Sequence, residues 1–526
     1  ISNSGTAPDL MFRNNDIRYN TVGETTIGLV IGAGDYNATF TENNVSHNDA
    51  DNYMLTFVSR GQIKVMDNAF WDNVNSSGVM VIIGSSNTST IEVTDNVVRD
   101  NDGMGIVVTS MGLMTIERNQ VWDNTDHGIV ATTELSATVI EAEIYVDENE
   151  VYRNGGNGIW TVSMNTVEVT NNEVVGNRQA GIRINAMKEL PDLTDNTIDG
   201  NDVGVFLAGD NLAPLTTTYT FSDLVITDST HEGFYAEDLT IVLRSCTISG
   251  STDADLAVRR ARIDCYSTDV GYASGHVYMA GHIKVWWRVD IDVQWQSGTT
   301  VPYAHVLLAS DYDNRTYREL DTDYDGHINT FNIEEWSMVD EQVNRWSPFR
   351  CTASKNTESS IQVETVDRDR NILLVLRDAH VPDVVITEPE EDALLNYAIV
   401  RVAGTADDTG SGLRTVRIRV GAGDWTDMGK VTTFSKLINI DDGTHTVTVQ
   451  AEDVAGMLGN ATVTITVDTE PPRLMVTSPE EGLLTNSSEI SVEGTLMEPG
   501  LTVEVEGVLQ TILDSKFTEP GLYPPE

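Results

Sequence analysis

A six-residue frame, Asn-x-apolar-x-x-Asn, recurs along the first half of the chain and constrains the fold more than any other feature of the sequence. Successive copies start 22 to 30 residues apart. A period in this range without a helical pattern is typical of a β-solenoid in which each repeat forms one coil. Complete copies open at Asn15, Asn43, Asn68, Asn96, Asn119, Asn149, Asn172 and Asn196, and close at Asn20, Asn48, Asn73, Asn101, Asn124, Asn154, Asn177 and Asn201. Degenerate copies follow at Asp223, Cys246 and Thr268.

The third place of the frame is apolar in all eleven copies. Stacked coils place like residues on like, so these side chains are predicted to form one interior column. The Asn side chains at the two ends of the frame are predicted to form amide ladders at the corners of the coil. The predicted interior column consists of Ile17, Val45, Phe70, Val98, Val121, Val151, Val174, Ile198, Val225, Ile248 and Val270.

These repeats resemble the right-handed parallel β-helix repeats of NosD-like and pectin-lyase-like proteins. The resemblance covers residues 1–280 and implies an all-β fold for them. It does not define a reaction, because this fold hosts lyases, hydrolases, epimerases, adhesins and surface-layer proteins.

The pattern changes after residue 280. Residues 283–296 alternate apolar and polar side chains over one long strand, and residues 281–381 resemble a transthyretin-like or carboxypeptidase-regulatory-like β-sandwich. Residues 382–470 and 471–526 repeat each other at an offset of 90, as PEE at 389–391 and 479–481 shows. They resemble one complete and one partial immunoglobulin-like (Ig-like) module of bacterial and archaeal extracellular proteins. We expect the sequence to be a piece of a longer protein, and its last module to be completed by a neighbouring chain.

The composition argues against binding to nucleic acid and against a membrane-spanning segment. The chain has 81 acidic and 32 basic residues, a net charge of -49, which would repel nucleic acid. No stretch of 18 or more apolar residues occurs, so the sequence predicts no transmembrane segment. The N-x-S/T sequons at Asn37, Asn44, Asn75, Asn87, Asn314, Asn460 and Asn486 permit glycosylation.

The strongest metal signal lies in the segment DTDYDGHIN, at 321–329, where carboxylates alternate before a Gly, as in the front of an EF-hand loop. The usual bidentate Glu at place twelve is replaced by an Asn, and strands rather than helices flank the segment, so an Asp-rich hairpin tip is the alternative. The predicted calcium ligands are Asp321, Asp323, Asp325, His327, Asn329 and Asn332.

Two outward rows of the frame are further candidates for binding. The fourth place includes Trp71, Trp122 and Tyr152, which could stack on sugar rings or dock a protein unless neighbouring loops cover them. The fifth place includes the acidic residues Asp72, Asp100 and Asp123. Stacked carboxylates repel, so these could bridge calcium or stand on a solvated face.

Catalytic and cysteine signals are sparse. His127 fits a polar turn place better than a base, and the basic residues Arg183 and Lys188 near Asp195 have no second acid at a convincing spacing. Cys246 and Cys265 lie about one coil apart, so either a disulfide or buried thiols are open, and Cys351 has no evident partner. We name no catalytic residue.

The sequence therefore favours a non-enzymatic protein of the prokaryotic cell surface: a structural or adhesive scaffold of a surface layer, sheath or filament. Expected partners are further copies of the chain, neighbouring surface proteins and glycans. The alternatives are a polysaccharide lyase or epimerase acting on acidic glycans, and a NosD-like periplasmic accessory protein.

Overall fold

The computed structural model describes residues 9–23, 25–30, 37–74, 77–133, 142–187, 189–209, 217–270, 275–487, 490–498, 502–505, 508–510 and 516–522. In these ranges every regular element is a β-strand, which confirms the predicted all-β fold. The chain forms two compact units. The first unit comprises residues 1–294, 300–355 and 359–376, and the second comprises residues 295–299, 356–358 and 377–526.

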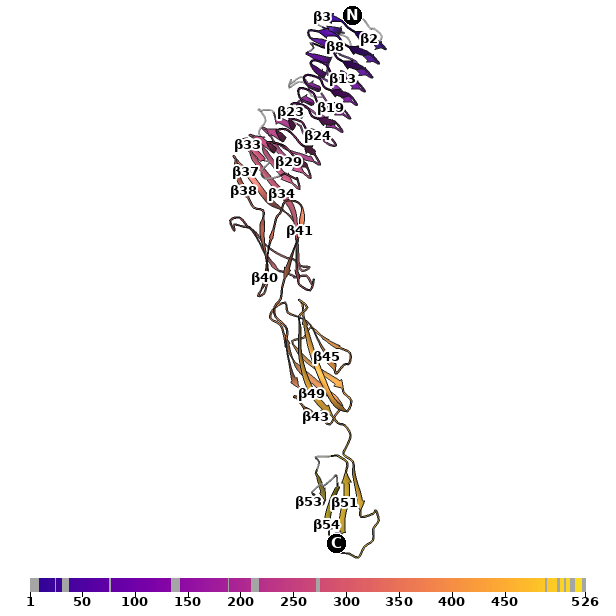
Figure 1. Ribbon diagram of the computed structural model, residues 1–526, viewed down its shortest axis with the longest axis vertical. Coiled ribbons are helices and arrows are strands. Elements are labelled where there is room, and N and C mark those ends of the chain that lie inside the picture. Colours follow the sequence, from indigo (N-terminus) through magenta and orange to yellow (C-terminus); the bar gives the residue numbers. More distant parts are fainter. Residues whose placement is uncertain are drawn as a thin grey trace. The chain divides into compact units, whose positions relative to one another are not determined.

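Parallel sheets form the sides of the β-helix, and successive coils add strands to each sheet (Figure 1). One side holds β1 (Leu10–Arg13), β5 (Ala38–Thr41), β9 (Gln62–Met66), β12 (Thr90–Thr94), β15 (Leu113–Glu117), β18 (Ile144–Asp147) and β21 (Val167–Thr170), and a later sheet on it starts with β26 (Thr218–Ser222), β29 (Thr240–Arg244) and β32 (Arg262–Tyr266).

The strands that carry the sequence frame form the sheet we call the frame sheet. Each of them is three residues long, so the middle residue points inward and its two neighbours point outward. The frame sheet holds β2 (Asp16–Arg18), β6 (Asn44–Ser46), β10 (Ala69–Trp71), β13 (Val97–Arg99), β16 (Gln120–Trp122), β19 (Glu150–Tyr152), β22 (Glu173–Val175), β24 (Thr197–Asp199), β27 (Val225–Thr227) and β30 (Thr247–Ser249).

The strands that follow the frame form a third side, which we call the long sheet. It holds β4 (Thr25–Val30), β8 (Tyr53–Ser59), β11 (Gly78–Gly84), β14 (Met104–Ser110), β17 (Ile129–Thr133), β20 (Ile159–Val162), β23 (Ala180–Met187), β25 (Val203–Gly209), β28 (Glu232–Glu237), β31 (Ala254–Arg259) and β33 (Gly275–Met279). A short pair, β3 (Thr21–Val22) and β7 (Asp49–Ala50), lies between the two sheets in the first coils.

The predicted interior column is correct except at one coil. The described column is buried at the seven positions from Val45 to Ile198 and again at Ile248 and Val270. In the first described coil, Ile17 is partly buried. Val225, however, is 49% exposed, while Ile226 is buried and pairs with Ile198. The frame in this coil starts at Leu224 rather than at Asp223. Asp223 instead takes the left-handed backbone place (φ 58°) just before the frame, as Asp195 does one coil earlier (φ 58°).

Both predicted Asn ladders are present. In each ladder the Nδ2 group of one Asn donates to the Oδ1 atom of the Asn in the next coil, as Asn119 does to Asn149 at 3.0 Å. The same Oδ1 atom also accepts the backbone N–H of the previous Asn, at 2.9 Å for this pair. The first ladder runs from Asn15 to Asn196 and the second from Asn20 to Asn201.

The β-helix passes directly into the next sandwich through one strand. β34 (His282–Trp295) pairs in parallel with β32 of the last coil and antiparallel with β37 (His327–Val339). β37 continues to β38 (Gln342–Arg345), and β41 (Arg370–Leu376) also pairs with β34. The second sheet of the sandwich holds β36 (Thr316–Asp321), β35 (His305–Ser310), β39 (Phe349–Lys355) and β40 (Glu358–Glu364).

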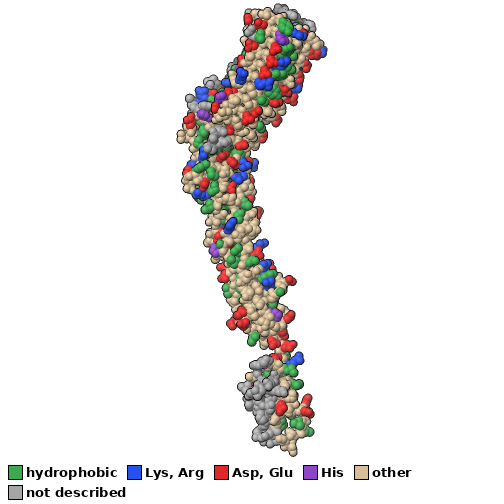
Figure 2. Space-filling model, in the orientation of Figure 1, with side chains coloured by type: hydrophobic (Ala, Val, Ile, Leu, Met, Phe, Trp, Pro, Cys, Tyr) green, Lys and Arg blue, Asp and Glu red, His purple; other side chains and the backbone are tan. Residues whose placement is uncertain are grey.

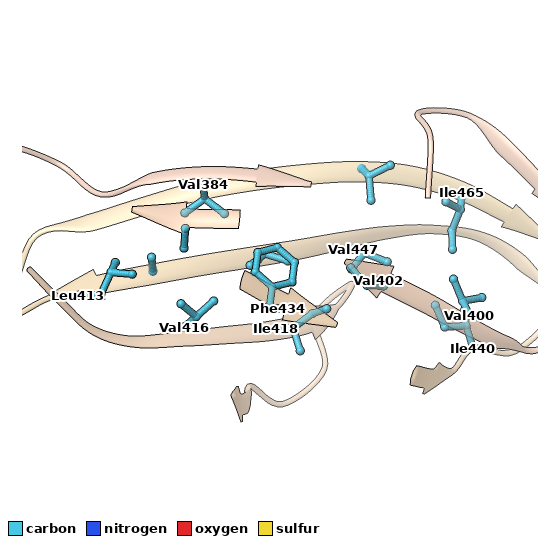
Figure 3. Close-up of a cluster of buried hydrophobic side chains, with 14 of the residues drawn as sticks. Val384, Val400, Val402, Leu413, Val416, Ile418, Phe434, Ile440, Val447 and Ile465 are labelled. Atoms are coloured by element: carbon cyan, nitrogen blue, oxygen red, sulfur yellow. The ribbon is translucent and has the colours of Figure 1, made fainter. Parts of the chain in front are cut away.

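The second unit contains a two-sheet sandwich with its own apolar core. Val402, Val416, Phe434 and Val447 are among the buried side chains that fill the space between the sheets (Figure 3). One sheet holds β42 (Asp383–Glu388), β44 (Ile399–Asp407) and β47 (Thr433–Asn439). The other holds β43 (Ala393–Leu395), β49 (Leu458–Val467), β48 (Gly443–Asp453), β45 (Leu413–Val420) and β46 (Thr426–Gly429).

The C-terminal strands repeat the start of this sandwich on a smaller scale. β50 (Leu474–Ser478) pairs antiparallel with β51 (Ile490–Leu496), as β42 does with β44. β54 (Lys516–Leu522) completes this sheet, and β52 (Val503–Val505) pairs with β53 (Val508–Gln510). Leu496 and Val503 form the buried centre of the part that the structure describes.

The three cysteines are all buried thiols, so the disulfide between Cys246 and Cys265 is not formed. Cys246 occupies the opening place of its frame, where earlier coils have a ladder Asn. Cys265 lies in β32, and its side chain is fully buried in the interior of the β-helix. Burial raises the pKa of both thiols, which favours their neutral form.

Candidate functional site

The fourth place of the frame forms a mixed aromatic and cationic row on the outer face of the frame sheet. Register pairs Trp71 with Arg99 and Arg99 with Trp122 in successive coils, and Trp122 with Tyr152 in the next. The guanidinium of Arg99 lies 5.3 Å from the ring centre of Trp71 and 6.0 Å from that of Trp122. The structure therefore brings the three predicted binding residues into one row.

The aromatic side chains of this row are partly buried. The ring of His47 packs edge-on to Trp71 at 4.5 Å, and the indole N–H of Trp71 donates to Asn44 at 2.9 Å. Burial, together with a hydrogen bond to Glu173, raises the pKa of the Tyr152 hydroxyl. Because Arg99 already lies against both indoles, a ligand would meet mainly their exposed edges and a positive charge between them.

A second aromatic row lies on the outer face of the long sheet, and sequence reasoning missed it. Trp160, Arg183, Phe206 and Tyr235 follow one another in register. The guanidinium of Arg183 lies 4.3 Å from the ring centre of Phe206, whose ring stacks on Tyr235 at 4.8 Å. The row could have been found from the sequence, because each of these residues takes the first outward-facing position after an interior residue of its strand. Outward places were considered only within the six-residue frame and not in the strands that follow it.

His127 and Arg183 have structural partners. The Nδ1 atom of His127 accepts the backbone N–H of Asn157 at 2.7 Å, and burial lowers the pKa of the ring. This agrees with the predicted polar turn place. Arg183 donates to Asn185 at 2.9 Å and lies between rings, while Asp195 takes a left-handed corner before the frame. The third residue of the predicted grouping, Lys188, lies outside the described residues.

The three acidic residues of the fifth place share a left-handed backbone conformation, which Tyr19, His47 and Arg153 also take at this place in other coils. Asp72, Asp100 and Asp123 all have left-handed φ angles, of 53°, 54° and 52°. Asp and Asn tolerate this conformation better than most residues, and Gly176 and Gly200 take the same place in later coils. Each carboxylate also lies beside a basic side chain: Asp72 lies 3.6 Å from the imidazole of His47, Asp100 pairs with Arg99, and Asp123 pairs with Arg153 at 2.7 Å. Figure 2 shows acidic, basic and hydrophobic side chains interspersed on this part of the chain.

The predicted calcium loop connects β36 in one sheet of the sandwich to β37 in the other. The Oδ1 atom of Asp323 accepts the backbone N–H groups of Asp325 and His327, at 2.9 and 3.0 Å. Asp321 pairs with His305 at 3.0 Å, and His327 pairs with Asp292 at 2.8 Å. Asn329 and Asn332 lie further along β37. The loop stays a predicted calcium site, although several of its ligand atoms already have partners within the protein.

Sequence reasoning also missed a group of three acidic residues in the second unit. The carboxylate oxygens of Asp378, Asp408 and Asp453 lie within 4.8 Å of one another. These residues are separated by 30 and 45 positions, so no local motif joins them. Each follows a strand or ends one, which is the only signal that the sequence offered.

Two family models match the chain. Residues 2–144 and 141–216 match the right handed beta helix region, and residues 382–469 match glucodextranase domain B. No curated protein matches the chain. No helix among the described residues is long and apolar enough to cross a membrane.

Solved structures give weaker likenesses. Fibronectin(III)-like modules of Clostridium thermocellum CbhA are 16% identical, covering 32% of this chain and 79% of that one, with a TM-score of 0.16. A 1.5-MDa bacterial ice-binding adhesin is 14% identical, covering 46% and 87%, with a TM-score of 0.20. Human CDH23 EC21-23 is 13% identical, covering 45% and 92%, with a TM-score of 0.19. At these TM-scores the likenesses support no argument about function.

The fold and the family models agree on the fold of two parts of the chain. Residues 2–216 are a right-handed β-helix region, and residues 382–469 are an Ig-like β-sandwich similar to glucodextranase domain B. The predicted resemblances of these two ranges are thereby confirmed, and the transthyretin-like character of residues 281–381 stays a prediction.

Proposed function

We propose that the chain is an extracellular scaffold of the cell surface, in which the β-helix serves as a rigid rod and presents its two aromatic rows to glycans or neighbouring proteins. One observation carries this proposal: the two Asn ladders join eight successive coils without interruption, from Asn15 and Asn20 to Asn196 and Asn201. Each coil is held to the next by buried side-chain bonds in addition to its backbone pairing, which suits a load-bearing element.

The aromatic rows support a binding role for the rod. Trp and Tyr at a partly buried, regularly spaced row offer apolar area and hydrogen-bond donors at low entropic cost. The proposed partners are glycans, further copies of the chain or other surface proteins. The large acidic excess, a net charge of -49, agrees with a calcium-containing exterior, where such a surface attracts divalent cations.

The location is tested on cells of the source organism. Antibody raised against the purified chain should label intact cells as strongly as permeabilised ones. Labelling that requires permeabilisation would contradict an extracellular scaffold.

The enzymatic alternative is tested with the same preparation. The full chain, incubated with a panel of uronic-acid polymers, should release no unsaturated product, whereas a lyase would do so.

Glycan binding should weaken in the double variant Trp71→Ala and Trp122→Ala and stay unchanged in Tyr303→Ala, an exposed aromatic of the sandwich. Unchanged binding in the double variant would remove the frame-sheet row from the proposal.

A further inference from the structure

The three acidic residues of the second unit gather at one end of the Ig-like sandwich. Asp408 directly follows β44, and Asp453 ends β48. Asp378 lies in the segment that leads into β42, whose first residue pairs with the last residue of β44. The loop after Asp408 also meets the turn after Asp453, because the backbone N–H of Val454 donates to the carbonyl of Gly412 at 2.9 Å. The topology of the sandwich therefore brings three distant residues together.

The backbone holds each carboxylate by one or both of its oxygens. Oδ1 of Asp453 accepts the N–H of Met457 at 2.7 Å, and Oδ2 of Asp408 accepts the N–H of Gly412 at 2.6 Å. Asp378 accepts the N–H of His380 at 2.8 Å and the N–H of Ser411. These bonds fix the three carboxylates in place.

Two of the remaining oxygens are buried without a hydrogen-bond partner among the described residues. They are Oδ2 of Asp453 and Oδ1 of Asp408. Asp453 is 0% exposed and Asp378 is 3% exposed. An unpartnered buried carboxylate oxygen is costly, and a second carboxylate beside it increases the cost. A cation between them would remove both penalties.

The loop after Asp408 packs tightly against the Asp378 carboxylate. A Cβ atom at Gly410 would collide with both oxygens of the Asp378 carboxylate, so a glycine is needed where the loop after Asp408 crosses it. The same carboxylate also belongs to a neighbouring group with Glu358 and His380. That group includes an imidazole, whereas the three aspartates offer only oxygen, the ligand type that calcium and magnesium prefer.

We propose that Asp378, Asp408 and Asp453 bind a calcium ion at this end of the Ig-like sandwich. The unpartnered oxygens of Asp408 and Asp453 would coordinate the ion, and the negative charge of Asp378 would attract it. Water or backbone carbonyls would complete its coordination shell. Burial raises the pKa of Asp408 and of Asp453, and the neighbouring acids add to both increases. In the ion-free site the charged forms of Asp408 and Asp453 are therefore disfavoured, whereas for Asp378 burial is outweighed by the hydrogen bonds from His380 and Ser411, which lower its pKa. The proposal does not depend on where the protein is located.

The test is calorimetric titration of the full chain with calcium chloride after treatment with a chelator. Asp453→Asn should weaken calcium binding at this site by more than about 10-fold, the loss caused even by changes to residues that only orient a metal ligand. Asp424→Asn, which removes an exposed charge from the same module, should leave binding unchanged. Equal affinity for magnesium chloride would overturn the assignment to calcium.

Two further measurements separate loss of the site from misfolding. In chelator, Asp453→Asn should raise the unfolding temperature of the sandwich, because the substitution removes a buried charge, while added calcium should no longer raise it. A variant that unfolds at lower temperature in chelator would contradict the proposed repulsion. The double variant Asp323→Asn and Asp325→Asn should retain the calcium heat of this site. If that variant abolished all of the heat, the ion would bind at the loop after β36, and the proposal would be overturned.

Discussion

The Asn ladders of the β-helix and the three aspartates of the Ig-like sandwich differ in whether their buried polar atoms have hydrogen-bond partners. In the β-helix, each ladder Asn is bonded to its copies in the neighbouring coils, so the repeat that builds the fold also satisfies these buried amides. In the sandwich, Asp408 and Asp453 leave buried oxygens unpartnered, and these come together from separate loops. The comparison teaches that repetition pairs each buried ladder amide with its own copies, while convergence of unlike residues creates a place for a ligand.

The largest expected effect concerns the interior of the β-helix. Ile226→Ala should lower the free energy of unfolding by about 3 to 4 kcal/mol, because it leaves a cavity in the stacked column. Val225→Ala, one residue earlier on the exposed face, should change it by less than about 0.5 kcal/mol. Denaturant unfolding of both variants tests the corrected register. Equal effects would contradict it.

The next effect concerns the ladders. Asn119→Ala should cost about 2 to 3 kcal/mol, because it leaves the buried backbone N–H of Asn96 without its acceptor and removes the bonds that Asn119 donates to the carbonyl of Val93 and to Asn149. Asn87→Ala, at an exposed loop position, is the matched control and should cost little. A ladder variant as stable as the control would show that repetition is not what satisfies these groups.

A smaller effect depends on pH and concerns the sandwich that follows the β-helix. Burial raises the pKa of Glu335 to about 7, although Trp287 donates to its carboxylate at 2.6 Å. The folded protein therefore holds a proton that the unfolded chain has lost, and stability should fall by about 2 kcal/mol as the pH rises from about 4.5 to about 7. Glu335→Gln should remove most of this fall, which denaturation at pH 5 and pH 8 would measure.

The matched control for this pH effect is Glu319→Gln, an exposed acid of the same sandwich. It should keep the pH dependence of the unchanged protein. A flat stability profile in the unchanged protein would mean that Glu335 is ionised at little cost.

The smallest effect concerns the aromatic row of the frame sheet. Arg99→Gln should cost about 1 kcal/mol, since it removes two cation–π contacts at a partly exposed site. It should also shift the tryptophan emission, because Trp71 and Trp122 lose the group between them. Arg178→Gln, an exposed arginine of a later coil, should do neither. Identical spectra would mean that the row is loosely packed.

How far the sequence predicted the molecule follows from the same contrast. The frame predicted the parallel β-helix, the ladders and the interior column, because each coil repeats the same local pattern. It was wrong at Val225, where Asp223 was taken for a frame residue although it occupies the left-handed place before the frame. Asp378, Asp408 and Asp453 could not be grouped from the sequence, since only the pairing of β42, β44, β45 and β48 brings them together.

The most direct test of the coil register is a disulfide introduced between adjacent coils. Gln120 and Glu150 pair across neighbouring strands of the frame sheet and hydrogen bond at 3.0 Å on its outer face. Gln120→Cys with Glu150→Cys should form a disulfide on mild oxidation, because parallel neighbours lie about 5 Å apart. Gln120→Cys with Glu173→Cys, two coils and about 10 Å apart, should not. Cross-linking of the second pair, or of neither, would contradict the stacking of coils on which the account depends.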